Sequence, residues 1–102
     1  MVKAMITPKR KLLTIDEAET IGLQTLAFLA EEPERLGRFL SLTGIGPDNV
    51  RAAATDRAFL AAVIGHLRED ESLLLVFAAT AGLPAEQLGQ AESMLKGEQR
   101  AD

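Results

Sequence analysis

Glycine and proline residues divide this chain into short segments, and that division limits the possible folds more than any other sequence feature. Three glycines each follow an apolar run, where a glycine in the left-handed conformation ends a helix. Three prolines each begin a new segment, because proline at the first helical position leaves no N–H unpaired. The glycines are Gly44, Gly82 and Gly97, and the prolines are Pro33, Pro47 and Pro84. The pattern predicts a series of short helices joined by tight turns.

The first predicted helix runs from about Ile15 to Ala30. Thr14 and Glu17 form a capping-box pattern, in which the threonine hydroxyl accepts the glutamate N–H and the carboxylate returns to the threonine N–H. Apolar and small residues recur every three or four positions, which is the spacing of one buried helix face. The face comprises Ile15, Ala18, Gly22, Thr25, Leu26 and Leu29, flanked by Ile21 and Phe28.

Two further segments supply the expected core. A helix that begins near Thr55 and Asp56 carries apolar residues on one broad face, namely Phe59, Leu60, Val63, Ile64 and Leu67. The segment Leu73–Ala81 (LLLVFAATA) is apolar on nearly every side, so we expect other helices to surround it, with Phe77 buried. No stretch alternates polar and apolar residues with period two, so no strand is predicted. The expected fold is all-α, a compact orthogonal bundle of five or six short helices.

The distribution of charge indicates one domain with a basic leader. The 102 residues suffice for one core. Residues 1–13 hold four basic side chains and no acid, whereas the remaining 89 residues carry 7 basic and 15 acidic side chains, a net charge of −8. We expect 1–13 to be a basic, flexible leader, 14–97 a single helical domain and 98–102 a frayed tail. The acidic body argues against nucleic acid and anionic membranes as main partners, since both require clustered Lys and Arg.

The sequence also favours a cytoplasmic location. Cysteine is absent, so nothing requires an oxidising compartment. The N-terminal residues contain no apolar stretch of the length a secretory signal needs. Leu73–Ala81 is far shorter than the roughly 20 residues that span a bilayer. No association with a membrane is therefore expected.

No residue pattern indicates catalysis. His66 is the only histidine, and it lies at the edge of an apolar face, which is typical of a boundary side chain. No serine stands in a G-x-S-x-G elbow and no glycine-rich phosphate loop is present. Glu69, Asp70 and Glu71 stand where a helix begins, where acids cap backbone N–H groups rather than bind a metal. We expect no enzyme activity, no catalytic, cofactor-binding or metal-binding residue, no cofactor and no small-molecule ligand.

A helix-turn-helix pattern keeps one alternative open. Small and apolar residues follow the spacing by which DNA-binding helix pairs pack, namely Ala78, Gly82, Leu83, Leu88 and Ala91. The helix that would enter the groove, about Pro84 to Lys96, begins with acidic and amide side chains, and the acids repel phosphate. Weak binding of nucleic acid is therefore the alternative function, behind protein interaction.

The last predicted helix carries a narrow apolar stripe formed by Leu88, Ala91, Met94 and Leu95. This stripe either completes the core of the monomer, which we favour, or docks on another chain. Leu88, Met94 and Leu95 are thus the candidate partner-binding residues. Met94 is the most available of them, because it lies off the centre of the stripe and its thioether adapts to varied surfaces. The expected function is a non-enzymatic helical interaction module that binds a protein partner or a second copy of itself.

Several segments, in their order along the chain, resemble a known family. They are PERLGRFLSLTG (Pro33–Gly44), FLAAVIGHL (Phe59–Leu67), DESLL (Asp70–Leu74) and the corner Gly82–Pro84. Over about residues 17 to 96 the chain resembles a family of short bacterial proteins classed only as a domain of unknown function. The resemblance implies a small cytoplasmic helical domain and supplies no catalytic residue.

Overall fold

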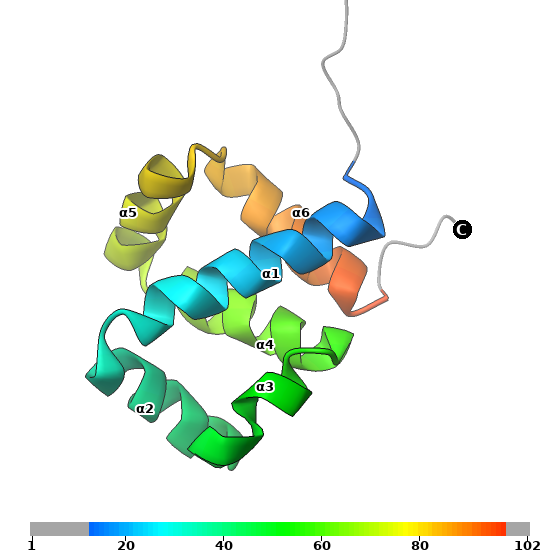
Figure 1. Ribbon diagram of the computed structural model, residues 1–102. Helices are drawn as coiled ribbons and strands as arrows, with labels where there is room; N and C mark the ends of the chain where they lie inside the picture. The colour runs from blue at the N-terminus through cyan, green and yellow to red at the C-terminus, as the bar shows by residue number, and fades with distance from the viewer. Residues whose placement is uncertain (1–12, 98–102) are drawn as a thin grey trace, which may run out of the picture.

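The caps and breaks of the sequence produce six α-helices and one turn of 3-10 helix (Figure 1) in the computed structural model, which describes residues 13–97. In chain order they are α1 (Ile15–Ala30), α2 (Pro33–Thr43), η1 (Pro47–Asn49), α3 (Val50–Ala53), α4 (Arg57–Arg68), α5 (Glu71–Ala81) and α6 (Ala85–Leu95). This range contains no strand, which confirms the all-α prediction. Apart from Leu13, the predicted leader and the predicted tail lie outside the described residues.

Side chains cap the N-termini of three helices. The Thr14 hydroxyl accepts the N–H of Glu17 at 3.0 Å, and the Thr14 N–H donates to Glu17 Oε1 at 2.9 Å, which confirms the capping box. Asp56 accepts the N–H of Ala58 at the start of α4. Asp70 accepts the N–H of Leu73 at the start of α5, at 3.1 Å. The acids before α5 therefore include its cap, as predicted.

The predicted helix ends are confirmed at all three glycines. Gly44, Gly82 and Gly97 have φ values of 78°, 70° and 78°, and they are the residues with positive φ within the described range. Pro33 is the first residue of α2, as predicted. Pro84 differs by one position, because it has an extended backbone (φ −64°, ψ 138°) and acts as the N-cap, so that α6 begins at Ala85.

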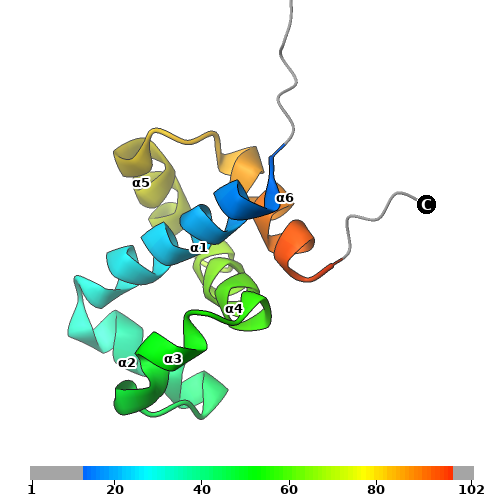
Figure 2. The same ribbon diagram turned by 45° about the vertical axis from the view of Figure 1, so that its right-hand side comes forward.

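Three helices form the centre of the bundle. α1 lies across α4, and α6 packs against both of them (Figure 1, Figure 2). The large side chains that are fully buried come from these three helices, namely Leu29, Ile64, Leu67, Leu88 and Val63. Thr25 is buried with them, and its hydroxyl donates to the Ile21 carbonyl at 2.8 Å. The predicted core face of α4 is thereby confirmed. That of α1 is confirmed in its middle and C-terminal turns, but Ile15 and Leu26 are only partly buried and the flanking Ile21 is buried in their place.

Gly22 permits the close approach of α1 and α4. A methyl group at this position would lie 2.8 Å from Leu60 Cβ, which is closer than two carbon atoms tolerate. Leu60 Cβ is attached directly to the backbone of α4, so the collision cannot be relieved by rotating a side chain. A glycine within the predicted buried stripe of α1 thus sets the distance between two central helices.

Replacing Gly22 with alanine should therefore destabilise the protein, although alanine is the better helix former. We expect a loss of about 1–3 kcal/mol in the free energy of unfolding, measured by denaturant melts. The matched control is Gly37→Ala in α2, where a new methyl group would meet nothing within 4 Å. That variant should gain up to about 1 kcal/mol from helix propensity. Equal stabilisation by both substitutions would contradict the close packing at Gly22.

The prediction for Leu73–Ala81 is correct on one side of the helix and wrong on the other. Phe77 and Ala78 are buried, but Leu75 and Val76 are each 54% exposed. The reason is that α5 lies at the edge of the bundle, where α4, α1 and α6 cover only one of its sides (Figure 1). The segment is thus more apolar than its buried side requires.

Candidate functional site

The core leaves the outer face of α5 uncovered and uncharged. We define this outer face as the exposed residues Ser72, Leu75, Val76, Ala79 and Thr80. Helical geometry groups them on one side of the helix, opposite Phe77. Among the described residues, other large apolar side chains with high exposure are Leu23 in α1 and Leu42 in α2, which stand singly on their own helices. Within residues 13–97, α5 alone exposes two large apolar residues next to each other.

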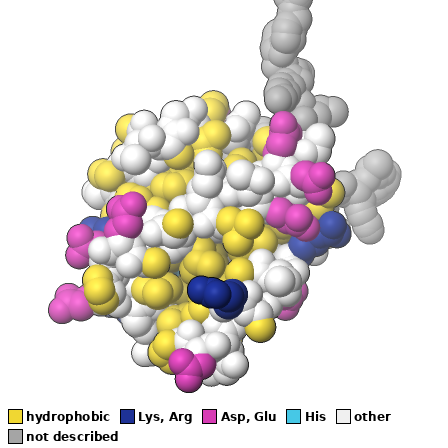
Figure 3. All heavy atoms as spheres, viewed as in Figure 1, with side chains coloured by type: hydrophobic (Ala, Val, Ile, Leu, Met, Phe, Trp, Pro, Cys, Tyr) yellow, Lys and Arg dark blue, Asp and Glu magenta, His cyan; other side chains and the backbone are white. Residues whose placement is uncertain are grey.

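Absence of charge distinguishes this face from the rest of the body. No charged residue occurs between Glu71 and Glu86. Over α5, at the upper left of Figure 3, hydrophobic and uncharged side chains cover the surface above the acidic residues. The body that carries this helix has a net charge of −8 over residues 14–102. The outer face is therefore a neutral area on an acidic protein.

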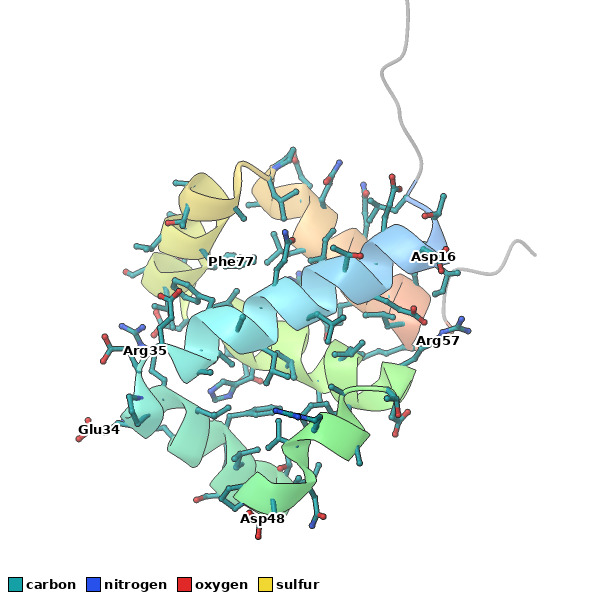
Figure 4. All side chains as sticks on the ribbon, viewed as in Figure 1. Asp16, Glu34, Arg35, Asp48, Arg57 and Phe77 are labelled. Atoms are coloured by element: carbon teal, nitrogen blue, oxygen red, sulfur yellow. The ribbon has the colours of Figure 1, made fainter. Side chains whose placement is uncertain are left out.

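The inner side of α5 holds the helix in place. Phe77 points from α5 toward the middle of the bundle (Figure 4), and its ring centroid lies 5.2 Å from that of Phe28 in α1. The Arg35 guanidinium lies 5.8 Å from the centroid of the Phe28 ring. At the other end of α5, the N–H of Leu83 donates to the Ala78 carbonyl at 2.9 Å. An aromatic anchor and a closed corner thus present the outer face in a fixed orientation.

The predicted partner-binding stripe of α6 lies largely in the core. Leu88 and Ala91 have no exposed surface and Leu95 is 5% exposed. Leu88 and Leu95 are therefore buried in the core, in the helix that packs on α1 and α4, which is the arrangement that the sequence analysis favoured. Met94 is partly buried against the same core, and its role in binding a partner stays a prediction.

An ion pair joins α4 to α6 next to two glycines. Arg68 Nη1 lies 2.5 Å from Glu92 Oε1, and Lys96 Nζ lies 3.2 Å from Glu92 Oε2. A methyl group at Gly65 would lie 2.7 Å from Glu92 Oε2, and one at Gly89 would lie 3.2 Å from Arg68 Nη2. Each charged side chain therefore occupies space that a glycine on the facing helix leaves open.

The corner between α5 and α6 has the shape of a helix-turn-helix. The two helices meet at Gly82–Pro84 with a bend of 99°, which lies within the range of about 90–120° between the two helices of that motif. Ala78, Leu88 and Ala91 are buried, as the spacing requires. However, α6 packs on two central helices, and its exposed residues include Glu86 and Gln90 rather than basic side chains. The corner thus has the packing of the motif without a basic reading face.

Two further polar features of the described residues are His66 and a groove beside α1. His66 is half-buried, and its ring lies 5.1 Å from that of Phe39, so it is the boundary histidine that was predicted. No group of three His, Asp or Glu residues within 13–97 is placed to hold a metal ion. A groove of about 400 Å³ between α1 and the α5–α6 corner is lined in part by Asp16, Glu17 and Thr20. Its Glu17 is already engaged in capping α1.

A comparison with known protein families decides the classification. The family described as "Protein of unknown function (DUF3572)" matches residues 15–98. The chain belongs to this family. Membership of DUF3572 confirms the resemblance seen in the sequence and covers every helix of the bundle. No curated protein and no solved structure matches this DUF3572 chain.

The same DUF3572 chain has no single helix within residues 13–97 that is long and apolar enough to cross a membrane. Helices α5 and α6 reach the required length and composition only when taken together, as a pair bent by 99°.

Proposed function

We propose that this chain is a small, non-enzymatic interaction module that binds a protein through the outer face of α5. The observation that carries the proposal is the exposure of Leu75 and Val76, neighbours in one helix that are each 54% exposed. Contact with water is unfavourable for both side chains, by about 25 cal/mol for each Å² of apolar area. Adjacent exposed apolar residues on a small domain are typical of interaction sites.

The way α5 is anchored supports this function. Burial of Phe77 and the caps at Asp70 and Gly82 keep the outer face ordered before any partner arrives. A surface that is already ordered loses less conformational entropy on binding, so a small contact area still gives useful affinity. A helix that only completed the core would not need two large apolar residues on its solvent side.

We further propose that the module acts in the cytoplasm and without catalysis. The absence of cysteine suits a reducing compartment. The single imidazole, that of His66, packs beside the ring of Phe39, with the two centroids 5.1 Å apart. Binding is therefore the role that these residues support best.

Co-purification with matched variants tests the proposal. The tagged full-length chain should retain a protein from its native cell, and Val76→Glu should reduce the amount retained by about tenfold, because a buried unpaired charge opposes docking. The control is Ala27→Glu, which adds the same charge at an exposed position of α1. Both variants should unfold at the wild-type midpoint. Equal retention by Val76→Glu and the wild type would contradict the proposal.

The 99° corner favours nucleic-acid binding as a second candidate. If this candidate were correct, the chain would retain duplex DNA at physiological ionic strength, with an affinity that falls steeply as salt is raised. Val76→Glu, which does not alter α6, would leave such binding in place. We expect no retention of DNA, because Glu86 and Gln90 occupy the exposed first turns of α6.

A further inference from the structure

We propose that the partner of the outer face is a second copy of this chain, bound through antiparallel pairing of two α5 helices about a twofold axis. This inference rests on the proposed function, since it names the occupant of the same surface. A twofold contact uses the same patch on both subunits, so the patch must be complementary to itself. The residue pattern and the charges of α5 both satisfy that requirement.

Four residues of the outer face are arranged symmetrically by size about a point between Leu75 and Val76. Its central residues are large and its ends are small, in the order Ser72, Leu75, Val76 and Ala79. When two such helices run antiparallel about a point between Leu75 and Val76, each Leu75 lies opposite Val76 of the second copy. Each Ser72 then lies opposite Ala79 of the second copy, and these small residues let the backbones approach. The large residues thus meet at the centre of the contact.

Charge selects the antiparallel direction. Glu69, Asp70 and Glu71 precede the outer face, and no charged residue follows it until Glu86. A parallel pair would place the three acids of one copy beside the same acids of the other, which is unfavourable. In the antiparallel pair Glu71 lies beside the uncharged Thr80 of the second copy. The helix dipoles also oppose each other in this arrangement, which is favourable.

Charge also favours a second copy over a strongly charged partner. Two bodies of net charge −8 repel each other wherever their acidic surfaces meet. The outer face of α5 is the neutral area where that repulsion is weakest. A basic partner would find no acid between Ser72 and Ala81, and an acidic partner would find no base there. A neutral surface that complements itself therefore fits another copy of the same helix.

The expected dimer is weak and is favoured by salt. One helix of 11 residues is about 16 Å long, so the contact is smaller than the roughly 1,200 Å² of a stable interface. We expect the dimer to form between about 10 μM and 1 mM protein. Because the paired residues of the outer face are uncharged, salt acts mainly by screening the repulsion between the acidic bodies. Raising the salt concentration should therefore strengthen the association.

Sedimentation equilibrium of the full chain provides the first test. The average mass should rise from 11.0 kDa toward twice that value as concentration increases, and it should rise further at higher salt. Val76→Glu should remain monomeric, because it places a carboxylate opposite Leu75 of the second copy on each side of the twofold axis, where no cation pairs with it. Ala27→Glu should associate as the wild type does. A dimer that Val76→Glu leaves intact, or that salt dissociates, would overturn the inference.

Engineered cysteines test the direction of the pairing, and the natural absence of cysteine makes the background clean. In the antiparallel pair Ser72 of one copy lies opposite Ala79 of the other. The double variant Ser72→Cys/Ala79→Cys should therefore form disulfide-linked dimers rapidly on oxidation. Two cysteines seven positions apart on one helix lie roughly 10 Å apart, too far for a bond within one chain. Faster cross-linking of Ser72→Cys alone would indicate a parallel pair and overturn the inference.

The two proposals fail in different ways. If the chain stays monomeric at about 1 mM while Val76→Glu still abolishes retention of another protein, the inference is wrong and the proposed function stands. If Val76→Glu changes neither self-association nor retention, the outer face is not a docking surface and both are wrong. A tagged chain that retains an untagged copy of itself, and loses it in Val76→Glu, supports both.

Discussion

Replacing Phe77 with alanine should lower the free energy of unfolding by about 3–5 kcal/mol. The Phe77 ring is 3% exposed, and its centroid lies 5.2 Å from that of Phe28 at an interplanar angle of 57°. The substitution removes the buried ring, leaves a cavity and breaks the tilted aromatic contact. For a domain of this size the loss is a large part of the total stability. Urea or guanidinium melts measure it directly.

The neighbouring residue provides the control. Val76 is 54% exposed, so Val76→Ala removes little buried area and should change the free energy of unfolding by less than about 0.5 kcal/mol at low protein concentration. The contrast between two consecutive residues distinguishes burial from a general sensitivity of α5. A loss below about 1 kcal/mol for Phe77→Ala would mean that α5 does not pack through this ring.

Deleting residues 84–102, which removes α6, should abolish cooperative unfolding. Helix α6 packs on both α1 and α4, and its Leu88 and Ala91 have no exposed surface. Without it, the faces of α1 and α4 that it covers are exposed to water, and an isolated short helix has little stability of its own. Thermal melts followed by circular dichroism should show a broad, weak transition.

A shorter truncation is the control for this deletion. Removing only residues 98–102 leaves all of α6 and its terminal Gly97, so this variant should melt as the full chain does. If the chain that lacks residues 84–102 melted cooperatively at the full-length midpoint, α6 would be an independent appendage rather than part of the core.

The parts of the fold that depend on neighbouring residues could be predicted from the sequence. The cap at Thr14, the helix starts at Pro33 and Asp56 and the breaks at Gly44 and Gly82 follow from backbone geometry within a few positions. The buried faces of α1 and α4 follow from helical spacing alone. The predicted start of α6 at Pro84 was one residue too early, because proline fits both the N-cap and the first helical position.

The candidate site could not be predicted, because it depends on how many neighbours each helix has. A run such as Leu73–Ala81 has the same pattern whether helices cover it on every side or on one. One signal that could have located the site is the lack of any charge from Ser72 to Thr80. This lack shows that the helix has no polar face, but not which of its sides stays exposed. Likewise, the stripe of Leu88 and Leu95 fits a core or an interface equally well until α1 and α4 are placed.

The glycines that face the ion pair between α4 and α6 have a consequence for the register of these helices. Glu92 lies against Gly65, and Arg68 lies against Gly89, so each helix carries both a protruding charge and a recess for the other. If α6 slid along α4 by one turn, both charges would leave the recesses that now accommodate them. Burying the two charges outside their recesses would cost free energy in the shifted arrangement, whereas the observed arrangement avoids that cost. The ion pair between Arg68 and Glu92 therefore contributes more to fixing the alignment of α4 and α6 than to stabilising the fold.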